Sequence, residues 1–272
     1  MTNPKISIIT CTYNSEKYLS ECIKSVQAQS YKFFEQVFID GISSDSTLEI
    51  IKKYYSNPII FSEKDSGLYD ALNRGFKKVN GDIVGILHSD DVFYDSDCLK
   101  RVAESFLNNP NVEYYCSKMV ICDGSLKNQF AILGAPPHRS SFREQLYSST
   151  YYAHPTYYFK RDVIEKVGCF DLRYRIASDI DWLIRLEKLN LSYYFDAKPL
   201  IRFRSEGISA KKYFTAIIEE YKVVKSHRGL SLRLIIVYIY HLSRRSIRFV
   251  LEGLGLSDVV VQLRRLILRI NK

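Results

Sequence analysis

The feature that most constrains the fold is a regular alternation of short apolar runs with amphipathic stretches. Apolar runs of four to six residues, rich in β-branched side chains, are typical of strands buried on both faces of a sheet. Apolar residues spaced by three and four are typical of helices. Strands are predicted at residues 6–11, 36–39, 59–62 and 83–87, and helices at 16–29, 46–55, 67–79 and 97–109. Repeated strand–helix units predict an α/β fold with a parallel sheet.

The second half of the chain is less regular. Residues 111–160 are rich in Tyr and are predicted to form irregular strands and loops. Short helices are predicted at 142–146 and 161–167, and an amphipathic helix at 179–189 with Ser178 as its cap. From residue 214 the pattern is mostly helical. We therefore predict one domain at residues 1–210 and a helical extension at 211–272.

The net charge of +9 is confined to the predicted extension. Residues 211–272 contain 13 Lys and Arg against 4 Asp and Glu, whereas residues 1–210 contain 26 of each kind. A neutral domain with a basic tail disfavours a nucleic-acid-binding protein, which would be basic throughout. The 272 residues, 46% of them hydrophobic, supply enough material for a large core.

The cysteines and the N-terminus indicate a cytoplasmic location. The six cysteines form no CxxC pair and no Cys/His cluster with zinc spacing, so we expect free thiols in a reducing compartment. The opening apolar run is too short for a signal peptide.

Polar residues follow each of the four predicted strands. Ligands of parallel α/β sheets bind at the carboxyl ends of the strands, so these residues are the candidates for chemistry. They are Thr12-Tyr13-Asn14, Asp40-Gly41, Glu63-Lys64-Asp65 and His88-Ser89-Asp90-Asp91.

The adjacent carboxylates Asp90 and Asp91 are the sharpest of these signals. Neighbouring negative charges repel each other unless a positive charge lies between them. Mg²⁺ prefers oxygen ligands and commonly bridges carboxylates to a substrate diphosphate. The alternative is a solvated turn that caps the next helix. Asp40, at the end of a strand, faces the ligand crevice and is suited to accept hydrogen bonds from a nucleotide base or ribose.

Three further residues have both structural and functional explanations. Asp179 and Asp181 lie in the first turn of a predicted helix, where acids complement the helix dipole, yet either of them could serve as a general base. His154 precedes a proline in a Tyr-rich stretch, where a lone histidine is usually structural.

The order of these motifs resembles family 2 glycosyltransferases, which have the GT-A fold. The resemblance rests on SIITCTYN at residues 7–14, FIDG at 38–41, SEKDSGLYDALNRG at 62–75, SDD at 89–91, GCFD at 168–171 and ASDIDW at 177–182. It spans roughly residues 5–209 and implies a Rossmann-like, mixed but mostly parallel sheet flanked by helices, followed by a C-terminal helical extension.

The resemblance implies a role for each matching residue. Asp179 becomes the catalytic base, although Ser178 stands where the family motif has Glu. Asp91 becomes the ligand of Mg²⁺ or Mn²⁺. The nucleotide-sugar pocket is implied to consist of Thr12, Tyr13, Asn14, Asp40, Asp65, Asn73, Arg74, Ser89 and Asp90, and contacts to acceptor or diphosphate are implied for His154, Asp181, Arg202 and Arg204.

The implied activity is inverting, metal-dependent transfer of a hexosyl or N-acetylhexosaminyl group from a nucleotide sugar, a UDP-sugar, to a saccharide. Bacterial relatives build polysaccharides such as O antigen or capsule, so we expect a lipid-diphosphate-linked acceptor. The alternative is a non-catalytic nucleotide-sugar-binding or scaffold protein on the same fold.

The basic tail suggests where the protein acts. Its longest apolar run, residues 234–242, falls far short of the ~20 residues that span a bilayer. Leu, Ile and Val alternate there with Arg, as in helices that lie on anionic membranes. We predict peripheral attachment to the cytoplasmic face of the inner membrane. The alternative is a helical pair packed on the catalytic domain or in a homodimer.

Overall fold

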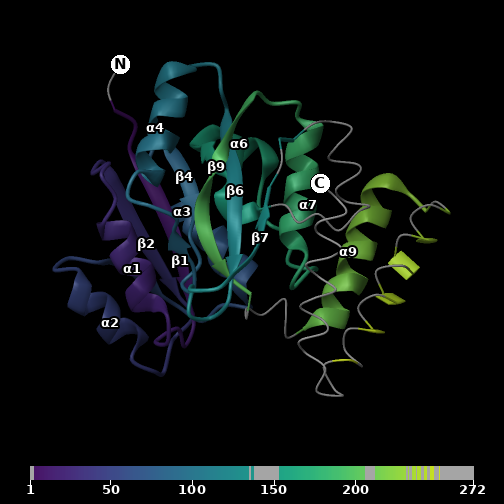
Figure 1. Cartoon of the computed structure of the whole chain (residues 1–272), viewed down its shortest axis with the longest axis horizontal. Coiled ribbons are helices and arrows are strands. Elements are labelled where there is room, and N and C mark those ends of the chain that lie inside the picture. The colour runs from purple at the N-terminus through teal and green to yellow at the C-terminus, as the bar shows by residue number, and fades with distance from the viewer. Residues whose placement is uncertain are drawn as a thin grey trace.

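The fold is an α/β sandwich around one nine-stranded sheet (Figure 1). The computed structural model describes residues 3–134, 136–137, 153–205 and 212–230, together with scattered residues between 232 and 251. The strand order is β3-β2-β1-β4-β8-β6-β9-β5, with β7 paired to β6.

The first half forms the predicted parallel βαβ units. The predicted boundaries hold to within three residues: β1 (Ile6–Thr12), α1 (Leu19–Gln27), β2 (Phe34–Asp40), α2 (Thr47–Tyr54), β3 (Ile59–Ser62), α3 (Leu68–Lys78), β4 (Ile83–Ile86) and α4 (Cys98–Asn108). β1 pairs in parallel with β2 on one side and with β4 on the other. The chain therefore reverses its direction of travel across the sheet between β1 and β4, which is the position where such sheets bind ligands.

The second half contains the irregular strands predicted over residues 111–160. They are β6 (Tyr114–Cys122), β7 (Gln129–Leu133) and β8 (Tyr158–Lys160), and β6 pairs with β7 and β9 through register shifts. The strand β9 (Tyr193–Arg204) was not predicted, because it mixes polar and apolar residues without a regular alternation. The helix predicted at 142–146 lies outside the described residues.

The remaining elements complete the domain. α6 (Arg161–Val167) confirms the short predicted helix, and α7 (Ser178–Lys188) begins one residue earlier than predicted. Ser178 is not the cap, since its hydroxyl donates to the carbonyl of Asp171 at 2.9 Å. The short strand β5 (Val92–Phe93) lies at one edge of the sheet, and the 3₁₀ turn η1 (His154–Thr156) contacts the central strands β4 and β6. All six cysteines are free thiols, as predicted.

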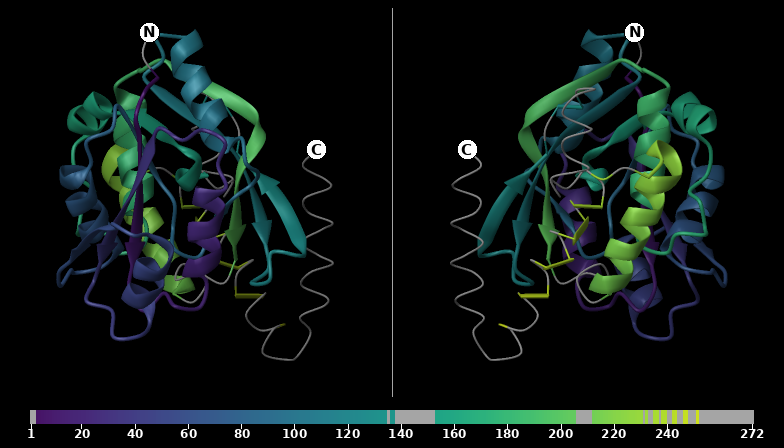
Figure 2. Two further views of the ribbon diagram at one scale, coloured as in Figure 1. Left: turned by 90° about the vertical axis from the view of Figure 1, so that its left-hand side faces the viewer. Right: turned by 90° about the vertical axis from the view of Figure 1, so that its right-hand side faces the viewer.

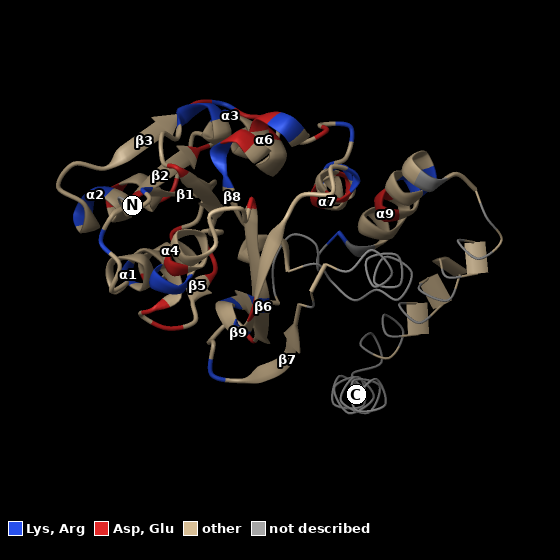
Figure 3. Ribbon diagram, turned by 90° about the horizontal axis from the view of Figure 1, so that it is seen from above, with Lys and Arg blue, Asp and Glu red and all other residues tan. Residues whose placement is uncertain are grey.

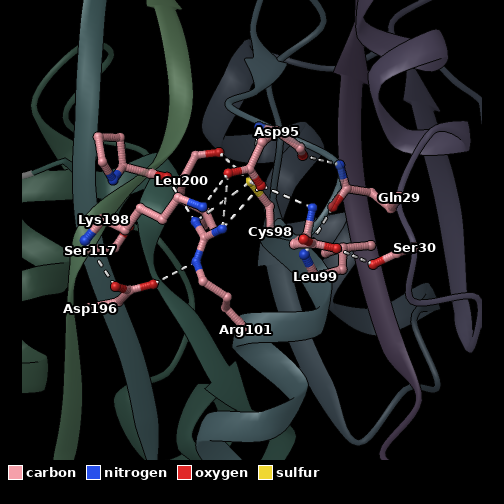
Figure 4. A network of polar contacts seen from close by, with 12 residues as sticks. Gln29, Ser30, Asp95, Cys98, Leu99, Arg101, Ser117, Asp196, Lys198 and Leu200 are labelled. Carbon is pink, nitrogen blue, oxygen red and sulfur yellow. Dashed lines mark hydrogen bonds and ion pairs between the residues drawn. The ribbon is translucent and has the colours of Figure 1, made fainter.

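We call the turn that carries Asp90 and Asp91 the acidic turn. A polar network holds β9 against the segment that follows this turn (Figure 4). Arg101 of α4 donates to Asp196 at 2.8 Å, to Asp95 at 3.0 Å and to the carbonyl of Pro199 at 2.8 Å. β9 also pairs with β5, which begins directly after Asp91. The network therefore fixes β9 beside the acidic turn.

The helix α9 (Tyr213–Arg228) packs on α7 (Figures 1 and 2). Val223 is fully buried and belongs to the same apolar cluster as Trp182 of α7. Both helices carry acidic and basic residues (Figure 3). The separate tail from residue 211 stays a prediction, but α9 itself is part of the core.

Beyond α9, several described apolar side chains are exposed. They are Leu232, Ile236, Ile239, Leu242 and Ile247. In the described parts of the chain, helices long and apolar enough to cross a membrane are absent.

Candidate active site

Asp40 ties together the ends of three neighbouring strands. Its fully buried carboxylate accepts hydrogen bonds from Thr12 of β1 at 3.0 Å and from Ser62 of β3 at 2.7 Å. The backbone N–H of Ser43 donates at 3.0 Å and its hydroxyl at 2.5 Å. Although burial opposes ionisation, these donors together hold the pKa of Asp40 below its ordinary value. Asp40 thus lies where β1, β2 and β3 end, and both of its oxygens accept hydrogen bonds from the protein.

Asp65 lies near Asp40, and its carboxylate accepts fewer hydrogen bonds than that of Asp40. Its Oδ1 accepts from the N–H of Gly67 at 2.9 Å, and burial raises its pKa. A Cβ atom at position 41 would lie 2.6 Å from Oδ2 of Asp65 and 3.3 Å from the ring of Tyr13. A side chain at position 41 would displace the carboxylate of Asp65, so Gly41 allows these side chains to gather at the end of β2.

The loop after β1 contacts the loop after β2. Asn14 has a positive φ of 48°, and its Oδ1 accepts from the N–H of Ser44 at 2.9 Å. Asn tolerates this left-handed conformation better than most residues. The ring of Tyr13 is exposed, so it is free to contact a ligand.

The acidic turn places Asp91 at the carboxyl end of β4, next to β1 in the sheet. Its backbone N–H donates to the carbonyl of His88 at 3.1 Å, which closes the turn after β4. Its side chain is fully buried, Oδ1 accepts from the N–H of Arg204 at 3.1 Å, and Oδ2 has no hydrogen-bond partner. Burial, reinforced by the charge of Asp90, raises the pKa of Asp91 well above its ordinary value. A buried carboxylate oxygen without a donor calls for a cation.

Arg204 braces the acidic turn from within the protein. Its guanidinium donates to the carbonyls of Asp90 and Gly124 and to the carboxylate of Glu21, and it lies 4.2 Å from the ring centre of Tyr18. The side chain is only 1% exposed. All three nitrogens are engaged by the protein, so Arg204 supports the site from behind.

Arg202 differs from Arg204 in its surroundings. It is partly exposed, its guanidinium lies 5.1 Å from the ring centre of Tyr94, and its buried Nε has no partner.

Asp179 lies in the first turn of α7, where Tyr69 of α3 reaches it. The Tyr69 hydroxyl lies 3.1 Å from Oδ1 of Asp179 and 2.6 Å from the carbonyl of Ile176. Burial raises the pKa of Asp179 to about 6, despite hydrogen bonds from the N–H of Ile180 and from Tyr69 that lower it. Because α3 follows β3, Asp179 lies at the carboxyl edge of the parallel strands, as Asp91 does.

Asp181 is turned away from this edge. It is buried and accepts from Arg185 at 2.9 Å, and Nε2 of His227 lies 2.7 Å from its other oxygen. Both oxygens are bound within the protein, which favours Asp179 over Asp181 as a base.

The other predicted residues have mainly structural contacts. Asn73 bonds to both the N–H and the carbonyl of Phe170, and Arg74 forms ion pairs with Asp70 and Glu63. Ser89 donates to the hydroxyl of Ser15 at 3.0 Å.

His154 is buried with no partner for Nε2, and its ring lies edge-on to Phe170. Burial, with a contribution from His88, lowers the pKa of His154 to about 3, so its imidazole is neutral.

Sequence reasoning missed two supporting residues, Tyr69 and Glu219. Tyr69 is a buried aromatic on an amphipathic helix, so the pattern offered only a core position. Glu219 accepts from the N–H groups of Ile176 and Ala177 at 2.7 and 3.2 Å, a contact that no local signal reveals.

A divalent cation fits the acidic turn on the chemistry of its donors. The unpaired oxygen of Asp91 and the neighbouring carboxylate of Asp90 are hard ligands. Within the described ranges there is no group of three or more His, Cys, Asp or Glu that would enclose a metal ion. A cation here would take its remaining ligands from water or substrate.

The fold is the GT-A fold of nucleotide-sugar-dependent glycosyltransferases. The mannosyltransferase PcManGT from Pyrobaculum calidifontis, solved with GDP-Man and Mn²⁺, superposes with a TM-score of 0.63 at 16% identity over 97% of this chain and 83% of that chain. S. aureus TarS (residues 1–349), solved with UDP-GlcNAc, gives a TM-score of 0.60 at 21% identity over 88% and 72%.

The sequence identifies the family. Residues 7–168 match the Glycosyl transferase family 2 model. A PGL/p-HBAD biosynthesis glycosyltransferase of Mycobacterium bovis (strain BCG / Pasteur 1173P2) is 33% identical over 191 residues, which cover 68% of this chain and 70% of the relative. The chain belongs to glycosyltransferase family 2.

Proposed function

We propose that this protein is an inverting glycosyltransferase that transfers a hexosyl or N-acetylhexosaminyl group from a UDP-sugar to a saccharide hydroxyl. The observation that carries the proposal is the presence, at one edge of the sheet, of two different carboxylates. Asp91 offers an unpaired, buried oxygen suited to a cation, and Asp179 has a pKa of about 6, suited to a base.

The donor side is assigned to the strand ends of the first half. Asp91, with Asp90, would hold Mg²⁺ or Mn²⁺ together with the diphosphate. The cation would supply electrostatic stabilisation of the negative charge that develops on the leaving diphosphate. Complexes of PcManGT with Mn²⁺ and of TarS with UDP-GlcNAc support a divalent metal and a nucleotide-sugar donor.

Recognition of the nucleotide is assigned to Asp40 and the residues around it. Asp65, which has an oxygen beside Gly41, and the exposed ring of Tyr13 would contact the base and the ribose. Thr12 and Asn14 would fix the shape of this pocket, while Asn73, Arg74 and Ser89 would act at its border. Arg202, with its unpaired Nε, is the better of the two arginine candidates for the diphosphate, because Arg204 is committed inside the protein.

The acceptor side is assigned to Asp179. The acceptor hydroxyl loses its proton to the carboxylate of Asp179 as its oxygen attacks the anomeric carbon, and the bond from that carbon to the diphosphate breaks. One base and one direct displacement invert the anomeric centre. His154, neutral and unpaired, is a candidate contact to the acceptor.

A donor screen tests the activity. UDP-sugars, with GDP-mannose for comparison, are incubated with Mn²⁺ or Mg²⁺ and a lipid-diphosphate-linked sugar as acceptor. Transfer that disappears in Asp91→Asn and in Asp179→Asn supports the proposal. Binding of UDP-sugar with neither transfer nor hydrolysis would instead favour the alternative, a non-catalytic nucleotide-sugar-binding protein.

We propose that the basic tail attaches the enzyme to the cytoplasmic face of the inner membrane, near a lipid-linked acceptor in O-antigen or capsule synthesis. The exposed side chains of Leu232, Ile236 and Ile239 and the arginines of the tail support this.

Co-sedimentation with vesicles of anionic or neutral lipid tests the attachment. The triple variant Leu232→Ser, Ile236→Ser, Ile239→Ser should bind anionic vesicles more weakly than the wild type. Equal binding by both proteins would contradict the membrane role and favour a homodimer contact.

A further inference from the structure

The N-cap residue of α7, the helix that carries Asp179, has no side chain that could cap the helix. This residue is Ala177, and α7 lacks a side-chain cap hydrogen bond. Helix N-termini leave N–H groups without intrahelical partners, and these groups favour a negative charge. Glu219 of α9 places a carboxylate at this end of α7, with its Oε2 atom 3.2 Å from the N–H of the N-cap Ala177 and 2.7 Å from that of Ile176, the residue before it.

Residue 176 is held from two sides. Its N–H donates to Glu219, and its carbonyl accepts from the hydroxyl of Tyr69 at 2.6 Å. The same hydroxyl lies 3.1 Å from Oδ1 of Asp179. A continuous set of polar contacts therefore leads from Glu219 through residue 176 and Tyr69 to the carboxylate of Asp179.

Two further contacts fix α9 in place. Nε2 of His227 lies 2.7 Å from Asp181, and its Nδ1 lies 2.9 Å from Nζ of Lys188. Val223, between Glu219 and His227 along α9, is fully buried against the main core. Glu219 is thus presented to α7 by a helix that is anchored on the catalytic domain, which makes its contact a defined one.

Resting on the proposed role of Asp179 as base, we propose that Glu219 is a positioning residue for Asp179. It fixes the backbone of residues 176 and 177. The carbonyl of residue 176 in turn fixes the position of the Tyr69 hydroxyl beside Asp179. The first helix of the C-terminal extension thereby completes the active site. Catalysis depends steeply on the placement of a reacting group, so loss of this contact should affect turnover more than donor binding.

Three variants of the full-length protein test this inference. Glu219→Ala removes the acceptor, Glu219→Gln keeps an acceptor oxygen without the charge, and Lys222→Ala is a control at an exposed position of the same helix. The readouts are kcat and KM for the UDP-sugar, the pH profile of kcat, and hydrogen exchange of the amides of residues 176–181. Thermal unfolding shows that each variant is folded at the assay temperature.

We expect Glu219→Ala to lower kcat about tenfold or more, with KM for the donor within about twofold. The acid limb of its profile should move to higher pH, because Asp179 loses the ordered donor Tyr69. Exchange at residues 176–181 should rise, Glu219→Gln should recover most of kcat, and Lys222→Ala should match the wild type.

Unchanged kcat and unchanged exchange in Glu219→Ala would overturn the inference while leaving the proposed function intact. Equal losses in the Gln and Ala variants would also overturn it, in favour of a charge effect. Hydrogen exchange needs no turnover, so it reports on the contact even without an active donor pair. Full activity of Asp179→Asn would remove the proposed base, and the positioning role with it.

Discussion

Tyr69 and Asp179 are 110 positions apart in the sequence, yet the hydroxyl of one lies 3.1 Å from the carboxylate of the other. The hydroxyl favours the ionised carboxylate and so opposes burial, which raises the pKa of Asp179 to about 6. Since a base acts in its deprotonated form, we expect kcat to fall as the pH drops through about 6. Initial rates between pH 4.5 and 9, at saturating donor, measure this limb.

Replacement of Tyr69 by Phe should move the acid limb to higher pH, because the carboxylate loses a donor that stabilises its charge. The shift is expected in the profile of kcat, with donor affinity preserved. An acid limb that stays in place in Tyr69→Phe would show that the hydroxyl does not act on the base.

Replacement by Asn should lower mainly the activity at Asp179 and mainly the stability at Asp181. Asp179→Asn should lower kcat by about 10²–10⁴-fold with little change in stability. Asp181→Asn breaks buried contacts with Arg185 and His227, so it should lower the free energy of unfolding by about 1–3 kcal/mol and keep the shape of the pH profile. Chemical denaturation and pH–rate measurements on both variants separate the two roles. A stable, inactive Asp181→Asn would exchange the assignments.

Asp91→Asn should abolish the metal dependence without harming the fold. The amide keeps an oxygen for the N–H of Arg204 and removes a buried charge that lacks a donor. We therefore expect thermal stability equal to or above that of the wild type. Titration with Mn²⁺, followed by donor binding and by transfer, checks the result. Saturable activation by Mn²⁺ in this variant would contradict the assignment.

Arg204→Met and Arg202→Met form a matched pair on β9. Arg204 is buried and its guanidinium donates three hydrogen bonds to the protein. Its loss should therefore reduce the free energy of unfolding by about 2–4 kcal/mol. Arg202 stacks on Tyr94, and its loss should lower stability by about 1 kcal/mol or less. If Arg202 contacts the diphosphate, Arg202→Met should raise KM for the donor. A fully stable Arg204→Met would contradict the structural role given to Arg204.

Ile42 occupies an unusual backbone conformation beside the proposed nucleotide site. Its φ is 62°, a left-handed value that is unfavourable for a β-branched residue, and its side chain is exposed. Ile42→Gly should therefore raise the free energy of unfolding by about 1 kcal/mol. Chemical denaturation measures the change, and the exposed Ile59→Gly serves as a control that should not stabilise. A destabilised Ile42→Gly would show that the side chain contributes more than its backbone strain removes.

The sequence predicted best what depends on contiguous residues. The four strands of the first half each form one apolar run, and parallel strands end at one edge, so Asp40, Asp65 and Asp91 could be placed together. β9 was not predicted, because its polar and apolar residues do not alternate regularly and its pairing with β6 is interrupted by register shifts around Lys118.

The site was predicted less completely where a role depends on distant partners. Asp179 and Asp181 look alike in the first turn of α7, and only Tyr69 and His227 tell them apart. Arg204 resembled a phosphate ligand by its residue type. Its acceptors come from segments about 80 or more positions away, so its burial could not be read from its neighbours.

The carboxylate of Asp40 has a thermodynamic consequence for ligand binding. It joins the ends of β1 and β3 to the end of β2 through Thr12 and Ser62, and Ser43 donates to it from the segment after β2. A nucleotide bound here, as proposed, would meet side chains whose rotamers these hydrogen bonds fix. Little conformational entropy is then lost on association, so more of the contact free energy is expressed as donor affinity.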